Sequence, residues 1–348
     1  MRIGKAERTF MVDSVFRNLG AKSPKVILGP GIGLDNAIMS AGSDHVLVVT
    51  TDPISFLPAL GPKLSSWLSV NLIASDYTTS GHTPEFASFD INFPREIKEK
   101  VRESFIAGLS SACKEIGTAI VAGNTGSYPG AGLSVIGSGT MFGFAQNGTY
   151  VDPTMAEDGD AVLMTKSAAL EATASLANSF PHTTKRNVGP YLFLKARTLT
   201  ESCSTVKDAM TAACVGLGKG GVTSMHDATE GGVLGALDEM ASASGKAFEV
   251  SVDDIPVSDE ASAVCGVFGL NPLTSLSEGT LLITCRPTRL RDLEDRFKET
   301  GIPIRLIGSV REGRGLKLTM RGKRFNPPQS SSDRYWATYT AAARTGLR

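Results

Sequence analysis

The chain has no net charge, few cysteines and no long hydrophobic run, and each absence excludes a class of protein. Its 35 lysines and arginines equal its 35 aspartates and glutamates, which gives no reason to expect a nucleic-acid or membrane-surface partner. No apolar run is long enough to span a bilayer. The first residues are basic but lack a following apolar segment, which disfavours a signal peptide. We therefore expect a cytoplasmic protein that binds neither nucleic acid nor membrane.

The cysteines and histidines form no pattern typical of a disulfide framework or a metal site. The five cysteines include no CxxC pair, and an odd number does not suit paired disulfides. We expect them to be buried, reduced thiols. The four histidines have no metal-ligand spacing with the cysteines or with each other. His226 is either a base or, as is commoner for a single histidine beside a strand, structural.

The alternation of strand and helix patterns predicts two α/β domains. With 348 residues, 41% of them hydrophobic, the chain can form two domains of ordinary size. A polar stretch rich in turn residues, 146–160, separates the two halves. We therefore predict an α/β (α+β) fold with domains at 1–148 and 149–348. The predicted strands are 46–51, 119–122, 133–144, 161–165, 248–252, 279–285 and 304–308, and the predicted helices are 67–77, 95–116, 170–178, 205–215, 232–244, 259–268, 290–300 and 333–343.

A glycine-rich loop in the first half could hold a phosphate. Residues 29–37 read GPGIGLDNA, and such a loop can bring backbone N–H groups close to phosphate oxygens. Its spacing does not fit a dinucleotide fingerprint, and a strand pattern rather than a helix follows it. The second glycine-rich stretch, 216–221, lacks the P-loop spacing. A plain turn is the alternative explanation of residues 29–37.

Several polar residues of the same domain interrupt or end apolar segments. Asp52 follows the strand at 46–51, Asp76 lies within an apolar helix, and Asn124 follows a short strand. Each one alone could be a cap or turn residue. If Asp35, Asp52 and Asp76 converge, they need a cation, because two carboxylates about 4 Å apart repel by about 4 kcal/mol at an effective dielectric near 20. Oxygen ligands together with ATP phosphates suit Mg²⁺.

A second candidate site lies in the other half of the chain. Residues 225–233 read MHDATEGGV, in which a predicted strand ends at Asp227 and a predicted helix begins at Gly231 and Gly232. Free N–H groups at a helix N-terminus can bind an anion. The alternative is ordinary capping, with Thr229 as the N-cap residue.

These segments, in this order, resemble the AIR synthase superfamily. It includes AIR synthase, thiamine-monophosphate kinase, selenophosphate synthetase, formylglycinamidine synthase and HypE, and the likeness is closest to archaeal-type HypE-related proteins. The resembling segments are 29–37, 51–54, 71–84, 123–125, 170–173, 222–240 and 277–280. The resemblance implies an N-terminal mixed-sheet domain that forms a homodimer, a C-terminal α/β domain, and ATP bound between the two.

The resemblance also implies a role for individual residues. Asp35, Asp52 and Asp76 would bind Mg²⁺ with the triphosphate. The implied nucleotide-binding residues are Gly31, Gly33, Gly123, Asn124, Thr125, Gly231 and Gly232. The implied catalytic residues are Asp227, Thr229 and Glu230.

Three positions depart from the family pattern. Asn124 stands where many relatives have a carboxylate, and it offers an oxygen without a charge. Leu34 replaces a common acidic residue, and His82 replaces an alanine. The chain also ends without the C-terminal cysteine that HypE modifies, and the nearest cysteine, Cys285, is predicted to lie in a strand. We therefore expect a free small molecule or a residue of a maturation-partner protein to be the substrate.

The resemblance implies one leading function and two alternatives. The leading one is an ATP-dependent enzyme that phosphorylates an amide-type oxygen and so drives dehydration or cyclisation. The first alternative is a small-molecule kinase of the thiamine-monophosphate kinase type. The second is a non-catalytic interaction protein of the kind that takes part in hydrogenase maturation.

Overall fold

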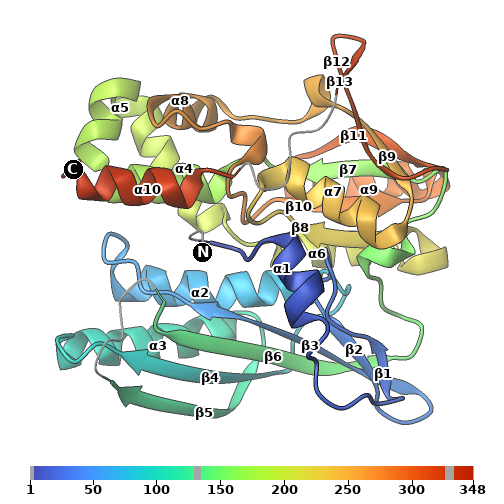
Figure 1. Ribbon diagram of the computed structural model, residues 1–348, viewed down its shortest axis with the longest axis horizontal. Helices are drawn as coiled ribbons and strands as arrows, with labels where there is room; N and C mark the ends of the chain where they lie inside the picture. Colours follow the sequence, from blue (N-terminus) through green and yellow to red (C-terminus); the bar gives the residue numbers. More distant parts are fainter. Residues whose placement is uncertain (1–3, 129–134, 326–332, 348) are drawn as a thin grey trace.

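A computed structural model describes residues 4–128, 135–325 and 333–347, and it consists of two α/β domains, each built on a mixed sheet. In Figure 1 the N-terminal domain lies below and the C-terminal domain above, with helix α2 and the N-terminal segment between the two sheets. The predicted fold class is confirmed. Among the described residues, every helix is too short or too polar to cross a membrane.

The N-terminal domain is a six-stranded sheet with the strand order β1-β2-β3-β6-β4-β5. Only β4 and β5 pair in parallel among these strands of the described chain. Its strands are β1 (Val26–Leu28), β2 (Ala37–Ser40), β3 (His45–Ile54), β4 (Phe86–Phe93), β5 (Ala119–Ser127) and β6 (Gly137–Gln146), and its helices are α1 (Arg8–Phe10) with the π-helical turn Met11–Val15, α2 (Gly61–Thr78) and α3 (Glu99–Glu115).

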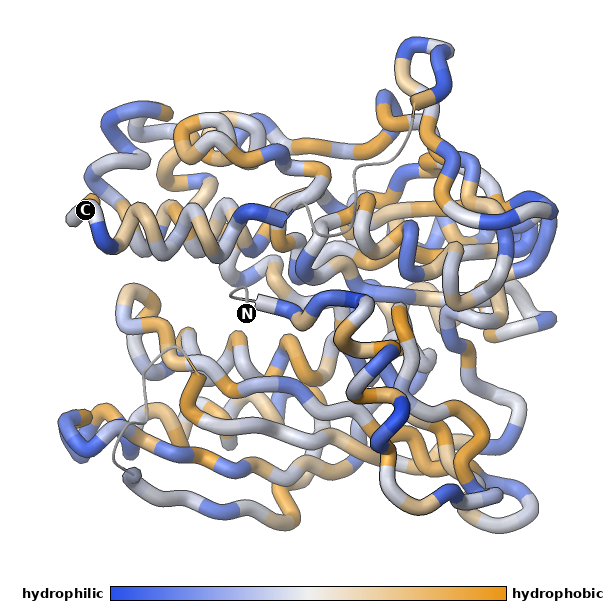
Figure 2. Tube along the Cα trace, in the orientation of Figure 1, coloured by the Kyte–Doolittle hydropathy of each residue, from blue (hydrophilic) through white to orange (hydrophobic). Residues whose placement is uncertain are grey.

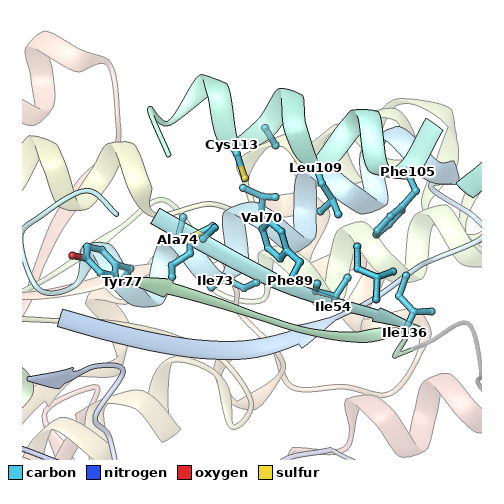
Figure 3. Close-up of a cluster of buried hydrophobic side chains, with 14 of the residues drawn as sticks. Ile54, Val70, Ile73, Ala74, Tyr77, Phe89, Phe105, Leu109, Cys113 and Ile136 are labelled. Carbon is cyan, nitrogen blue, oxygen red and sulfur yellow. The ribbon is translucent and has the colours of Figure 1, made fainter. Parts of the chain in front are cut away.

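The core of this domain lies between one face of the sheet and helices α2 and α3. Apolar residues at every second position of the strands point to this face, as expected for strands buried on one side. Figure 3 shows Val70 and Ile73 of α2, Phe89 of β4 and Phe105 and Leu109 of α3 meeting in one cluster. The opposite face of the sheet has no helix over it in Figure 1.

The C-terminal domain is a seven-stranded sheet with the strand order β13-β12-β9-β11-β7-β10-β8. Its strands are β7 (Ala161–Thr165), β8 (Val222–Asp227), β9 (Ala247–Ser251), β10 (Leu281–Cys285), β11 (Ile304–Arg311), β12 (Gly315–Met320) and β13 (Lys323–Phe325). Its α-helices are α4 (Leu170–Ser179), α5 (Pro181–Thr198), α6 (Val206–Ala213), α7 (Gly232–Ser244), α8 (Asp259–Val267), α9 (Leu290–Thr300) and α10 (Tyr335–Arg344), and short 3₁₀ turns lie at Pro153–Met155, Leu199–Ser202, Gly218–Gly220, Val252–Asp254, Pro272–Thr274 and Pro287–Arg289.

Helices cover both faces of this second sheet. Helix α7 packs on one face, while α6 and α9 pack on the other. Strand β7 is therefore buried on both sides: Val162 belongs to the first core and Leu163 to the second. Helices α4, α5, α8 and α10 form a separate cluster beside the sheet. In Figure 2 hydrophobic residues are common along the strands, whereas several of the outer loops are hydrophilic.

The predicted strands and helices are present, and β7, α7 and α9 are close to their predicted bounds. The α-helices and strands that were not predicted include α1, β1, β4, α5 and the β12–β13 hairpin. Helix α5 contains Pro190 and a non-helical residue, Gly189, so it consists of two helical pieces across a kink. Two details were wrong. Asp52 lies within β3 and Asn124 within β5, so neither ends its strand.

The remaining expectations on thiols and turns are partly confirmed. Four of the five cysteines are buried, but Cys214 is exposed. Part of the predicted strand 133–144 and most of the loop predicted before the last helix fall outside the described residues.

Candidate active site between the two domains

Carboxylates from both domains converge where the domains meet. Asp35 precedes β2, Asp76 lies on α2, and Asp227 ends β8. Asp35, His226 and Asp227 each offer a ligand atom within 4.8 Å of the other two, and the negative charges of Asp35, Asp52 and Asp227 all act on Asp76. Both carboxylate oxygens of Asp227 are buried, and among the described residues no N–H or hydroxyl group donates to them; only the Asp76 carboxyl lies within hydrogen-bonding reach. Such a group needs a counter-charge from a ligand.

Hydrogen bonds from neighbouring polar residues position Asp35 and Asp76. The Thr50 hydroxyl on β3 donates to the Asp35 carbonyl at 2.8 Å and lies 3.4 Å from Asp76 Oδ2. The Asp76 carbonyl accepts from Asn36 Nδ2 at 2.8 Å and from Thr79 Oγ1 at 2.7 Å. Thr50 lies on the same face of β3 as the core residues Val46 and Val48. This face of the strand is therefore apolar in the core and polar where it approaches the second domain.

The carboxylates raise one another's pKa. Burial, with the charges of Glu230 and Asp227, raises the pKa of Asp52 to about 7. Burial and the charge of Asp35 raise the pKa of Asp227 to about 7. Burial and the Asp227 carboxylate raise the pKa of Asp76 well above its usual range. The metal-free cluster therefore retains protons near neutral pH, and a bound cation would displace them.

His226 is a buried cation that connects the two domains. Its Nδ1 lies 2.7 Å from Asp35 Oδ1, and its Nε2 lies 3.2 Å from Glu239 Oε2 on α7. Burial alone would lower the pKa of His226, but the Asp35 and Glu239 carboxylates raise it to about 10. Burial would raise the pKa of Glu239, but the His226 hydrogen bond and the Lys5 ammonium lower it to about 2. His226 is thus a charged link rather than a free base.

Two further acids of the site, Glu171 and Glu278, lie in segments that carry the family resemblance, and neither was assigned a metal-binding, nucleotide-binding or catalytic role from the sequence. Burial and the nearby Glu230 raise the pKa of Glu171, in the first turn of α4, to about 8. Burial and the Asp227 charge raise the pKa of Glu278 well above its usual range, and its Oε2 is buried without a partner. Both acids interrupt or precede apolar segments, as Asp76 does, and this signal could have identified them.

The glycine-rich loop packs against the second domain. Gly33 has φ +73°, and a Cβ there would lie 2.8 Å from the backbone of Glu239. A side chain at this position would push α7 away. At Gly31, a Cβ would lie 2.7 Å from the Leu34 side chain. The loop therefore packs directly against the second domain beside Asp35. That Gly31 and Gly33 contact a phosphate stays a prediction.

The N-terminus of α7 already has an acceptor from the same chain. The N-cap residue is Gly231, so the suggestion that Thr229 is the N-cap was wrong. The Gly231 N–H donates to Asp333 Oδ2 at 2.9 Å, and the Thr229 carbonyl accepts from the Gly232 N–H at 3.0 Å. The side chain of Glu230 lies 3.4 Å from Trp336 Nε1. Glu230 joins the carboxylate cluster through its charge, whereas the roles predicted for Thr229, Gly231 and Gly232 stay predictions.

The remaining predicted nucleotide-binding residues lie on another part of the sheet. Gly123, Asn124 and Thr125 belong to β5, which is separated from β3 by β6 and β4. Three strand spacings place them roughly 14 Å from Asp52. Asn124 donates a hydrogen bond to Asp90 Oδ1 at 2.9 Å. Within one chain these three residues do not join the carboxylate cluster.

The raised pKa values predict how stability depends on pH. For the carboxyl groups of Asp52, Asp227 and Glu171, the folded pKa exceeds the unfolded value, so folding binds protons and stability is lost as pH rises from about 4 to about 8. The raised pKa of His226 acts in the same direction between about 6.5 and about 10. In EDTA, we expect the midpoint of thermal unfolding to fall by several degrees from pH 6 to pH 9. A midpoint that stays flat or rises would contradict this account of the cluster.

Comparison with family models identifies the domains. A model described as AIR synthase related protein, N-terminal domain, matches residues 33–145. The model of the C-terminal domain matches residues 157–321. Together they cover most of the chain.

Three curated proteins illustrate the sequence likeness. A protein of Methanocaldococcus jannaschii named for hydrogenase expression and formation is 26% identical over 335 residues, which are 92% of this chain and 93% of that protein. Carbamoyl dehydratase HypE of Rhizobium leguminosarum bv. viciae is 28% identical over 73% of this chain and 72% of its own length. Thiamine-monophosphate kinase of Aquifex aeolicus is 24% identical, with 94% and 98% covered.

Solved structures share the fold. AaThiL complexed with AMPPCP and TMP superimposes with a TM-score of 0.70 at 21% identity, covering 94% of this chain and 98% of that one. HypE in complex with ATP gives a TM-score of 0.68 at 20% identity, covering 93% and 95%. A chain of a HypE–HypF complex gives 0.70 at 18% identity, covering 91% and 99%.

Proposed function

The chain belongs to the AIR synthase related protein family, and from that membership and the site geometry we propose that it is an ATP-dependent phosphoryl-transfer enzyme. The observation that carries the proposal is the meeting of Asp35, Asp76 and Asp227 from the two domains, with the buried oxygens of Asp227 receiving no N–H or hydroxyl donor among the described residues. Relatives named as a carbamoyl dehydratase and a thiamine-monophosphate kinase support ATP as the phosphoryl donor.

The donor atoms of the cluster fit Mg²⁺. Asp35, Asp76 and Asp227 offer carboxylate oxygens, which Mg²⁺ prefers, and Asp52 adds a further charge beside them. A cation between these carboxylates would compensate the buried oxygens of Asp227, which lack an N–H or hydroxyl donor among the described residues. When bound, Mg²⁺ would neutralise the charges of these carboxylates and of the ATP phosphates.

The residues of the chain can align the substrate and move a proton. The charged His226 fixes Asp35 from the second domain, so the carboxylates keep their positions. A carboxylate whose pKa is raised by burial, such as Asp52 or Glu171, can accept the proton of an attacking hydroxyl, or the N–H proton of a carboxamide whose oxygen attacks. The γ-phosphoryl group then moves to that oxygen and ADP leaves. In a dehydration, phosphate then departs with the substrate oxygen and the nitrogen gives up a further proton to a base as the C=N or C≡N bond forms.

Dehydration is favoured over stable phosphorylation by the relatives that are named for hydrogenase maturation and carbamoyl dehydration. The kinase alternative is supported by the likeness to thiamine-monophosphate kinase over 94% of this chain. A solved relative is part of a HypE–HypF complex. We therefore also propose that the substrate carboxamide belongs either to a partner protein or to a free small molecule.

Phosphorus NMR separates these functions. The protein is incubated with ATP, Mg²⁺ and candidate carboxamides or hydroxyl compounds. We expect ADP and free phosphate in equal amounts if dehydration occurs. A stable phosphorylated product would instead establish the kinase, and the absence of any ATP binding or turnover would overturn the proposal.

We further propose that the chain forms a homodimer through the uncovered face of the N-terminal sheet. Phe144 on β6 is 49% exposed and pairs in register with Leu47 on β3, and both alternate with the buried core residues of their strands, so both lie on the uncovered face. An exposed apolar face of this kind is typical of an interaction surface.

Replacing Phe144 by glutamate tests the proposed dimer. Light scattering should give twice the chain mass of 36.6 kDa for the wild type and the single chain mass for F144E. The matched control is L306E, which places the same charge on an exposed strand leucine of the other domain and should remain dimeric. A wild type that is monomeric, or an F144E variant that remains dimeric, would refute this interface.

A further inference from the structure

The N-terminal segment crosses onto the C-terminal domain beside the carboxylate cluster. Figure 1 shows α1 next to α7. Arg8 lies 3.6 Å from Asp238 and donates to the Ser242 hydroxyl at 3.2 Å, both on α7. Gly4 lies against Trp336 of α10, where a Cβ would come within 2.7 Å of the indole ring. The segment is therefore seated between α7 and α10.

This placement brings Lys5 to the cluster. Lys5 Nζ lies 3.2 Å from Glu239 Oε1, and Glu239 Oε2 contacts His226, which in turn contacts Asp35. The charge of Lys5 also acts on Asp52 and on Asp227. An ammonium thus stands at the end of a chain of alternating charges that leads to the proposed metal ligands.

Lys5 differs from His226, the other cation of this chain of charges. His226 is 2% exposed and both ring nitrogens have carboxylate partners, so it has no capacity for a ligand. The Lys5 side chain is 50% exposed, and its ammonium contacts only the two oxygens of Glu239 among the described hydrogen bonds, at 3.2 and 3.5 Å. Lysine has a long side chain and three N–H donors, so the Lys5 ammonium can turn from Glu239 to a phosphate group.

We propose that Lys5 binds the terminal phosphates of the nucleotide, and that the N-terminal segment is thereby part of the active site. This inference rests on the proposed function. A triphosphate carries several negative charges, and the carboxylates of the cluster add more beside it. Cations are therefore needed near the terminal phosphates. An ammonium acts as a point charge that suits phosphate oxygens. Lys5 supplies that charge from outside the two matched family domains, which begin at residue 33.

The test compares the binding of a nucleoside triphosphate with the binding of the nucleoside alone. Isothermal titration measures the binding of ATP with Mg²⁺ and of adenosine to the wild type and to K5M, which keeps the length of the side chain. We expect K5M to bind ATP about 10- to 100-fold more weakly, as for a lost charge-assisted hydrogen bond, and adenosine equally well. K5R should retain most of the affinity for ATP.

Two further variants separate a phosphate contact from indirect effects. R8A loosens the same segment without removing the ammonium and should weaken ATP binding less than K5M. K5M/E239Q removes both charges of the pair. If the double variant binds ATP as weakly as K5M, the lost affinity reflects the phosphate contact. If it binds ATP as tightly as wild type, the weaker binding of K5M came from the uncompensated Glu239 charge. If wild type binds ATP and K5M binds it equally, the inference fails while the proposed function stands. If wild type does not bind ATP, both fail.

Discussion

Replacing Asp76 by asparagine should lower Mg²⁺-dependent ATP turnover by at least about 100-fold, since loss of even an outer partner of a metal ligand costs about 10- to 100-fold. The same variant should be more stable than wild type in the absence of metal, because the burial and neighbouring charges that raise the pKa of Asp76 act against its charged form. Turnover is measured by phosphate release, and stability by thermal unfolding in EDTA.

The opposite signs of the two effects make this experiment specific. A misfolded variant would lose both activity and stability, whereas a variant that lacks only a metal ligand would lose activity and keep its stability. The control is D44N, which makes the same change at an exposed aspartate and should alter neither quantity. A D76N variant with normal turnover would place the chemistry elsewhere.

Replacing His226 by leucine is expected to destabilise the fold by about 3 kcal/mol, because it leaves the buried Asp35 carboxylate without its cationic partner. His226 is 2% exposed and stands between Asp35 and Glu239. Without the imidazolium, Asp35 at 7% exposed loses its cation, while Glu239 at 15% exposed keeps only Lys5. The free energy of unfolding is measured with urea at pH 7.

The exposed His182 provides the matched control. H182L makes the same substitution at an exposed position in the first turn of α5 and should change the free energy of unfolding by less than about 0.5 kcal/mol. An H226L variant as stable as H182L would show that the link between the domains is not needed for folding.

Much of the fold could be predicted from local patterns. Apolar runs such as residues 161–165 are buried strands, and helices with regular apolar spacing such as α9 have the predicted bounds. Helix α5 could not be found this way because Gly189 and Pro190 break its pattern. The β12–β13 hairpin is short and partly exposed, so its alternation is weak.

The candidate site was partly predictable for a related reason. Asp76 is an acid inside an apolar helix, and such a residue calls for a partner wherever the chain places it. The partners themselves depend on contacts between distant residues: Lys5 meets Glu239 across 234 positions, and Gly231 meets Asp333 across 102. No local pattern encodes such pairs. Asn124 matches a family motif, yet strand order places it on β5, away from the cluster.

The central claim is that carboxylates of both domains hold one cation and its nucleotide, and the anomalous scattering of Mn²⁺ in crystals grown with Mn²⁺ and a non-hydrolysable ATP analogue tests it most directly. Our account predicts an ion peak at ordinary coordination distance from the side chains of Asp35, Asp76 and Asp227, next to the nucleotide phosphates. An ion and nucleotide bound on another surface, with these three side chains left without metal, would contradict it.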